Sequence, residues 1–486
     1  MLSQLPALDA QFLRVEDRRT HAHVGALVVL SPSDLTGEPL TLADVRYALE
    51  PRLQVLPSLR RRLVDNPLGV GDPFWADDPE FDVEYHLREL GVPAPGTDEQ
   101  LAEQVARIHA LPLDRARPLW EMYLLHGLSD GRVGIYAKMH AAALDESSGA
   151  GVLAALLDST AEPPDVAPEP WEPERVPSPL ELLPDAAADA LWRPRHFADG
   201  VSRSLPPPSA LPLVAGLPGA TLLDALAERV RTTLLAEPAA PVTRPQLQRP
   251  RTPFDGSMTG HRRFAFASVP LTDVKKVKNA FGLTVHDVVL ALVSGALRRW
   301  LLDRDALPDT ALVAAVPVSV GHADQASAAG VDGVVVMRVA LPTHLRDPEA
   351  RLEAVGDDVR LARTELDVLP ATSLQDISAV VPTGLSGLSA RALLRLTTQG
   401  GAPPVNLAVS NVPGPPVPLY VAGAKVEGLH PVPALASSTG GLSISVFSYD
   451  GALDVGLVAC RELVPDLSKI AGYLDDELAA LLSLVD

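Results

Sequence analysis

Lys138-Met139-His140-Ala141-Ala142-Ala143-Leu144-Asp145-Glu146 lies between a predicted strand and a predicted helix. Residues 133–139 form a short apolar run rich in β-forming side chains, and residues 149–157 have the small side chains of a helix opened by a serine. A turn at this place can project His140 and Asp145 into a cavity, where an imidazole can accept a proton and a carboxylate can fix its tautomer. Taken alone, the turn favours the plainer interpretation, a hydrogen-bonded structural histidine.

Further motifs precede and follow this turn in a distinctive order. They are Leu8-Asp9-Ala10-Gln11-Phe12-Leu13, Pro112-Leu113-Asp114 with Pro118-Leu119-Trp120-Glu121, Thr284-Val285-His286-Asp287-Val288-Val289, Ser410-Asn411-Val412-Pro413-Gly414-Pro415, and Ser448-Tyr449-Asp450-Gly451 followed by Leu463-Val464-Pro465-Asp466. Taken in this order, the motifs resemble those of the bacterial wax ester synthase/diacylglycerol acyltransferase family. The resemblance extends from Leu8 to Asp466, and so many pieces in one order are hard to obtain by chance.

The resemblance implies a mixed α/β (α+β) fold of two domains, like chloramphenicol acetyltransferase, with an active-site tunnel between the domains. Inside the tunnel the family carries a His-His-x-x-x-Asp-Gly motif, whose second histidine is the general base. In this chain the base position falls on Ala141 and the glycine position on Glu146, while His140 and Asp145 are retained. The family's aspartate is regarded as architectural, so Asp145 alone does not replace the base.

Other motif positions also depart from the family. Its Asn-Asp pair is represented by His286-Asp287, and its Gly-Asn pair falls on Val331-Asp332. Several departures together favour natural divergence, although an engineered change at Ala141 alone stays open. Asp287 follows Thr284 by three residues, which predicts a helix-capping role.

A positioned general base contributes about 10²–10⁴-fold to rate, so its loss predicts slow acyl transfer unless another group takes the proton. The adjacent His140, Glu146 at the helix start and His286 from the other domain are three candidates. Each also has a structural interpretation: a packed histidine, a carboxylate favoured by the helix dipole and a first-turn residue. The resemblance adds six candidates for substrate binding, namely Pro118, Leu119, Trp120, Asp287, Ser410 and Asn411; Ser410 and Asn411 are at least as well explained as turn residues.

Composition narrows the classes of partner. The 486 residues include 41 Lys plus Arg and 61 Asp plus Glu, a formal charge of −20, which argues against nucleic-acid binding and against a polybasic membrane anchor. With Cys460 as the single cysteine and no signal-like N-terminus, a cytoplasmic location is expected. We expect no transmembrane segment, because no stretch reaches about 18 uninterrupted apolar residues; peripheral contact with a membrane or lipid droplet stays open.

No metal site and no bound cofactor are expected, with acyl-CoA acting as a co-substrate that the resemblance implies. His21-Ala22-His23 is the one close histidine pair outside the motifs, and the sequence offers it no evident further ligands. His23-Val24-Gly25 matches part of a further family motif at this point.

Proline density suggests how the chain is divided. We expect an N-terminal acyltransferase-like domain over residues 1–161, a Pro-rich, part-helical linker over 162–255, and a C-terminal acyltransferase-like domain over 256–486. Within the C-terminal domain, alternation of apolar and polar residues around Asp450-Gly451 predicts a β-hairpin. Thr272 is expected to cap a helix over 273–280, and a second helix is predicted over 467–484.

Three functions are compatible with these residues. The first, which we favour, is an acyl-CoA-dependent O-acyltransferase that moves a long-chain acyl group to an alcohol or a diacylglycerol hydroxyl, drawing its rate mainly from proximity. The second is a repurposed tunnel enzyme with different chemistry on an acyl or polyketide-like substrate. The third is a non-catalytic protein that binds a lipid or a partner.

Overall fold

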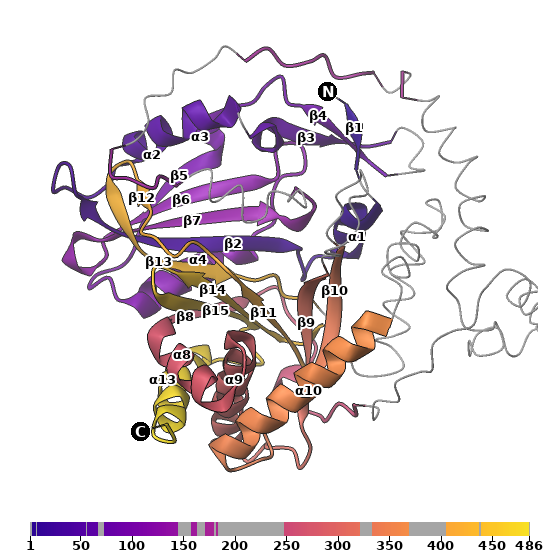
Figure 1. Ribbon diagram of the computed structural model, residues 1–486. Helices are drawn as coiled ribbons and strands as arrows, with labels where there is room; N and C mark the ends of the chain where they lie inside the picture. Colours follow the sequence, from indigo (N-terminus) through magenta and orange to yellow (C-terminus); the bar gives the residue numbers. More distant parts are fainter. Residues whose placement is uncertain are drawn as a thin grey trace, which may run out of the picture.

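The computed structural model contains two six-stranded sheets, with helices gathered on the outer face of the second (Figure 1). It describes residues 2–5, 7–54, 56–66, 72–143, 157–162, 171–178, 181–182, 247–320, 333–368, 405–436 and 439–485. Both strands and helices are long enough to bury separate apolar cores in the two halves. The chain therefore has the mixed α/β, two-domain architecture expected from the sequence.

The first sheet is built mainly from the N-terminal half. Its strands, in spatial order, are β12 (Tyr420–Val421), β13 (Ala424–Val432), β2 (His23–Ser33), β7 (Val133–His140), β6 (Trp120–His126) and β5 (Leu87–Gly91). All neighbouring pairs are antiparallel except β5 and β6, which are parallel. The motif strand β7 is central, and its last residue pairs with the first residue of β2, so that His140 lies opposite His23.

The second sheet belongs to the C-terminal half. Its strands, in spatial order, are β10 (Gly333–Leu341), β9 (Leu312–Val320), β11 (Leu407–Val412), β14 (Leu442–Tyr449), β15 (Ala452–Cys460) and β8 (Arg262–Pro270). The predicted hairpin is confirmed: Tyr449 pairs with Ala452, and Asp450 and Gly451 both have positive φ, as a tight primed turn requires. Three strands, β1 (Ser3–Gln4), β4 (Phe74–Asp77) and β3 (Arg61–Val64), form a small third sheet.

Helices cover the sheets. The α-helices are α1 (Ala7–Val15), α2 (Leu42–Leu49), α3 (Val83–His86), α4 (Asp98–Ala110), α8 (Leu271–Phe281), α9 (Val285–Leu302), α10 (Pro348–Val368) and α13 (Leu467–Leu482). Short 3-10 turns are η1 (Glu50–Gln54), η2 (Pro57–Arg60), η3 (Ser129–Gly131), η4 (Ala141–Ala143) and η6 (Pro253–Asp255). Helices α8, α9, α10 and α13 lie together on one side of the second sheet (Figure 1). α9 is apolar almost all round and is correspondingly buried.

Local sequence explains where several helices begin and end. Thr284 and Asp287 form the predicted capping box at the start of α9, and Gly282 ends α8 in the left-handed conformation that glycine favours. The predicted cap at Thr272 is wrong: α8 begins after Pro270 without a side-chain cap, and Thr272 lies inside its first turn. The fixed φ of proline suits it to the start of a helix, which explains the earlier beginning.

One strand crosses from the C-terminal half into the first sheet. β13 pairs antiparallel with β2, and it also runs close to β15 of the second sheet. Gly456 in β15 allows this approach, since a Cβ there would lie 1.6 Å from the carbonyl oxygen of Pro431. Asp454, 1% exposed, accepts hydrogen bonds from the Leu429 amide and the Ser268 hydroxyl, each at 2.6 Å, and so joins the two sheets.

A shared apolar core holds the halves together around α4. Leu101 and Val105 of this helix pack in one cluster with Tyr136 of β7, Phe264 of β8 and Val458 of β15. The motif strand is therefore fixed by side chains from both halves of the molecule.

Within the described residues no single helix is both long and apolar enough to cross a membrane; α8 and α9 pass such a test only together, with a bend of 104° between them.

Candidate active site

The motif strand β7 ends where the predicted turn begins. The His140 amide donates to the Leu119 carbonyl oxygen at 3.0 Å, and the Ala141 amide donates to the Ala22 carbonyl oxygen at 2.8 Å. The turn η4 starts at Ala141. These two hydrogen bonds anchor the motif on both sides, to the segment before β6 and to the segment before β2.

His140 has a partner at each ring nitrogen. Its Nδ1 accepts a hydrogen bond from the Ala142 amide at 3.0 Å, so the proton of the neutral ring is on Nε2, which lies 2.9 Å from Glu16 Oε1. The side chain is only 2% exposed. In this arrangement neutral His140 has no lone pair available to accept a proton from a substrate hydroxyl.

Ala141 supplies no proton acceptor from its side chain. Ala141 is the first residue of the 3-10 turn η4, after the strand β7 has ended. His140 is directed to Glu16 and therefore does not substitute for a base at position 141.

Glu16 follows α1 and lies against the end of the motif strand. Besides His140, its carboxylate accepts the Ala22 amide at 2.7 Å and the Arg115 guanidinium at 2.6 Å. Burial raises the pKa of this carboxyl, but the hydrogen bonds from His140, Arg115 and Ala22 outweigh burial and lower the pKa to about 2. Glu16 is therefore ionised at neutral pH.

Two more histidines continue the buried polar cluster. His23 Nδ1 lies 3.4 Å from the carbonyl oxygen of His109, and His109 Nδ1 lies 2.7 Å from the Tyr136 hydroxyl. Burial, reinforced by the positive charge of Lys138, lowers the pKa of His23 to about 3, and burial also lowers the pKa of His109. Both rings are neutral at physiological pH.

A buried ion pair supports the motif strand from the same face. Lys138 Nζ, with a side chain that is 0% exposed, lies 3.1 Å from Glu121 Oε2 and donates to the carbonyl oxygens of Ile108 and Leu111 at 3.1 Å. Burial lowers the pKa of the Lys138 ammonium, and Glu121 partly offsets this effect. Because the two carbonyl groups lie at the C-terminal end of α4, Lys138 holds that helix end against β7.

The predicted substrate-binding segment Pro118-Leu119-Trp120 lies beside the motif, as its order in the sequence suggested. Trp120 pairs with Met139, donates from Nε1 to the Leu59 carbonyl oxygen at 2.7 Å and stacks on His86 at 4.4 Å. All three residues of the segment are buried. Their contacts position the strands that carry the motif.

The remaining described candidates lie on the second half. His286, in the first turn of α9, has a buried Nε2 without a hydrogen-bond partner among the residues described, and burial lowers its pKa. Asp287 Oδ2 accepts the Thr284 amide at 2.9 Å and the Thr284 hydroxyl at 2.7 Å. Ser410 on β11 shares a 2.6 Å hydrogen bond with Ser445, and the neighbouring Asn411 is half-buried.

Asp145 and Glu146 lie outside the described residues, as does the Val331-Asp332 position. The structure thus brings together His140, Ala141 and the 118–120 segment, while the candidates at 286–287 and 410–411 come from the second half.

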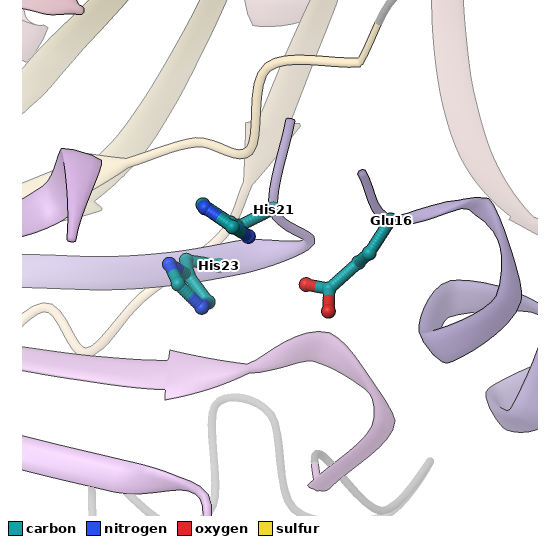
Figure 2. Close-up of side chains that lie close together, drawn as sticks. All are labelled: Glu16, His21 and His23. Carbon is teal, nitrogen blue, oxygen red and sulfur yellow. The ribbon is translucent and has the colours of Figure 1, made fainter. Parts of the chain in front are cut away.

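Sequence reasoning missed Glu16 and His109. Both are far from the motif in sequence, 124 residues in the case of Glu16 and His140, and each lies in a segment without a distinctive pattern. The signal that pointed to this region was the His21-Ala22-His23 pair. One ring nitrogen of His21, one of His23 and a carboxylate oxygen of Glu16 all lie within 4.8 Å of one another, so these three residues could hold a metal ion (Figure 2).

An apolar cavity of about 30 Å³ lies between the first sheet and α2, lined by residues such as Val28, Leu49, Ile135 and Ala137. This volume is about that of one water molecule, far below the roughly 300–1,000 Å³ typical of ligand sites. In the conformation described, this cavity does not accommodate an acyl chain.

Comparison with known proteins agrees with this architecture. Residues 5–289 match the wax ester synthase/diacylglycerol acyltransferase catalytic domain, and residues 333–482 match the C-terminal domain of the same family. The chain belongs to the wax ester synthase/diacylglycerol acyltransferase family of acyltransferases.

Relatives match along nearly the whole chain. A Mycobacterium tuberculosis (CDC 1551 / Oshkosh) protein named "Putative diacyglycerol O-acyltransferase MT1809" is 34% identical over 486 residues, covering 100% of this chain and 91% of that protein. The "Probable diacyglycerol O-acyltransferase tgs2" of M. tuberculosis (H37Rv) is 32% identical and covers 97% of each chain.

Solved structures share the fold. The wax ester synthase/diacylglycerol acyltransferase from Marinobacter aquaeolei VT8 is 27% identical, with a TM-score of 0.67 and coverage of 99% of this chain and 100% of that one. The TRI3 trichothecene 15-O-acetyltransferase from Fusarium sporotrichioides is 14% identical, with a TM-score of 0.55 and coverage of 99% and 95%, which shows a common fold.

Proposed function

We propose that this protein transfers a long-chain acyl group from acyl-CoA to the hydroxyl of a hydrophobic acceptor, a long-chain alcohol or a diacylglycerol. The observation that carries the proposal is the match of both family domains, with β7 ending at His140 beside the buried 118–120 segment. The proposed division of the chain is an N-terminal domain over 1–161, a linker over 162–255 and a C-terminal domain over 256–486. The C-terminal domain contributes β12 and β13 to the first sheet.

The reaction would form an ester bond between the acceptor oxygen and the acyl carbon and break the thioester, with CoA leaving as the thiol. The acceptor proton has to move to a base or to the departing sulfur. The alanine at 141 removes the family's base, and His140 has both nitrogens bonded, so neither residue of this pair takes that proton. We propose that proximity of thioester and hydroxyl provides most of the rate.

Three groups are candidates for assisting the proton transfer. His286 has an imidazole nitrogen without a hydrogen-bond partner in the described part of the chain. This supports His286 as the proton acceptor over His140, whose two ring nitrogens are both bonded. Glu146 is a second candidate, and the thiolate of the departing CoA is the third. Ser410, Asn411 and Asp287 are proposed to line the acceptor side of an inter-domain tunnel, with peripheral contact to a lipid surface supplying the hydrophobic acceptor.

A non-catalytic, lipid-binding role is the second candidate. The alanine at the base position and the occupied nitrogens of His140 favour it, because both remove general-base catalysis. The two roles differ in turnover: a binding protein retains acyl-CoA without releasing thiol.

The test is acceptor-dependent thiol release from long-chain acyl-CoA, with a long-chain alcohol and with diacylglycerol, for this protein and its Ala141→His variant. The proposal expects slow release by the protein and faster release by the variant. Retained acyl-CoA with no release by the unmodified protein would support the binding role and contradict the acyltransferase proposal.

A further inference from the structure

We propose that Glu16, His21 and His23 form a binding site for a divalent first-row transition-metal ion of the Zn²⁺ class. Two imidazoles and one carboxylate come from a single short stretch of chain that turns from α1 into β2, and they face one another (Figure 2). The site stands apart from the acyl-transfer proposal, because it requires neither acyl-CoA nor turnover.

The ligand set has the chemistry of a known class. Imidazole nitrogen and carboxylate oxygen are common Zn²⁺ ligands, and two histidines with one acidic residue leave a coordination position for water or another ligand. Zn–N bonds of about 2.0–2.1 Å place tetrahedral ligand atoms roughly 3.3 Å apart. The three ligand atoms lie within 4.8 Å of one another. Side-chain rotations that move each ligand atom by on the order of an ångström bring all three into contact with one ion.

His23 is already oriented for this role. Its Nδ1 faces the His109 carbonyl oxygen at 3.4 Å, a contact that favours the tautomer with Nε2 as the metal ligand. His21 lies two residues earlier, on the same face of an extended segment, and its ring stacks on His23 with centroids 5.1 Å apart and planes 18° apart. In the described part of the chain, the His21 nitrogens make no hydrogen bond, and this half-buried residue gives an ion access from solvent.

Charges of both signs act on the two histidines of the site. The cations are Lys138 and Arg262, and the anions are Glu16 and Asp17. Lys138 is paired with Glu121 at 3.1 Å, and Arg262 donates to the Thr259 carbonyl oxygen at 2.6 Å.

Two of the hydrogen-bond partners of Glu16 bear on the proposal. Arg115, 51% exposed, can turn to solvent when an ion takes its place at the carboxylate. The bond from His140 to Glu16 links the site to the motif, so a bound ion would clamp residues 16–23 against the end of β7.

The experiment is isothermal titration of the full-length, chelator-treated protein with Zn²⁺, repeated with Co²⁺ as a spectroscopic probe. We expect one saturable site per chain and a Co²⁺ absorption spectrum of a nitrogen- and oxygen-ligated ion. His21→Ala should weaken affinity by more than about tenfold. This variant should fold, because the side chain is half-buried and its nitrogens make no hydrogen bond to the described residues.

His261→Ala is the matched control. His261 is 61% exposed and pairs with Glu462 at 2.9 Å, and so offers a second His–Glu pair that lies outside the proposed site. Its replacement should leave affinity unchanged. Absence of saturable binding, or equal affinity in the protein and His21→Ala, would overturn the metal site, while acyl transfer would be judged separately by thiol release.

Discussion

His140 donates from Nε2 to Glu16 Oε1 at 2.9 Å while its Nδ1 accepts the Ala142 amide at 3.0 Å. This pair makes the retained motif histidine a structural residue that fixes the end of β7. The neighbouring position, to which the resemblance assigns the base of the family, holds alanine. On the proposed assignment, the chain keeps the framework of the family's site without its proton acceptor.

The first prediction concerns the stability that Glu16 provides. Glu16→Ala removes the acceptor shared by His140, Arg115 and the Ala22 amide, and the free energy of unfolding should fall by about 1–3 kcal/mol because buried donors lose their partner. Chemical denaturation measures the change. Glu103→Ala on the exposed face of α4 is the control, with an expected change within about 0.5 kcal/mol. Equal effects of the two substitutions would show that the Glu16 bonds contribute little.

The second prediction follows from the low pKa of Glu16. Because the folded-state pKa, about 2, lies below the ordinary value of 4.5, its ionised form stabilises the folded state at and above pH 4.5. This contribution is lost as pH falls from 4.5 towards 2. The difference in unfolding free energy between the protein and Glu16→Gln should therefore shrink over that window in denaturation measured at a series of pH values. A difference that stays constant would contradict the assigned pKa.

The third prediction concerns the buried pair Lys138–Glu121. Lys138→Met leaves Glu121 buried and two carbonyl groups of the α4 end without their donor, so unfolding free energy should fall by about 3–5 kcal/mol. In Lys138→Met/Glu121→Gln the loss should be smaller than the sum of the single losses, since the carboxylate charge that loses its ammonium partner and keeps only Arg88 and the Tyr123 hydroxyl is removed. A double-mutant cycle by denaturation measures this coupling, and additive losses would argue against it.

The fourth prediction separates the roles of neighbouring residues on α9. Asp287→Ala removes the capping box and should lower unfolding free energy by about 0.5–2 kcal/mol. His286→Leu removes a buried nitrogen that has no partner among the described residues, and it should leave stability unchanged or higher. Thermal unfolding compares them. A large loss of stability in His286→Leu would indicate an essential structural contact at this ring.

Local patterns predicted much of the fold. Alternation around Asp450-Gly451 gave the β14–β15 hairpin, and Thr284 with Asp287 gave the start of α9, since each depends on residues close in sequence. The ordered motifs predicted the two-domain architecture through resemblance to the family.

Other features depend on contacts that no local pattern encodes. β13 leaves the second half and pairs with β2, about 400 residues earlier in the chain, and Gly456 and Asp454 accommodate and hold that crossing. The bond between Glu16 and His140 likewise joins segments that only the folded sheet brings together. For this reason His140 could be interpreted from sequence as a candidate base, whereas its two hydrogen bonds give it a structural role.

The most direct test of the account is acceptor-dependent thiol release from long-chain acyl-CoA, measured in parallel for this protein and for Ala141→His. The account predicts slow but acceptor-dependent release by the protein, and an increase of up to about 10²–10⁴-fold in the variant, because the histidine supplies a general base at the position that the resemblance assigns to it. Release by the unmodified protein that is already fast and does not rise in the variant would contradict it, as would no release by either protein.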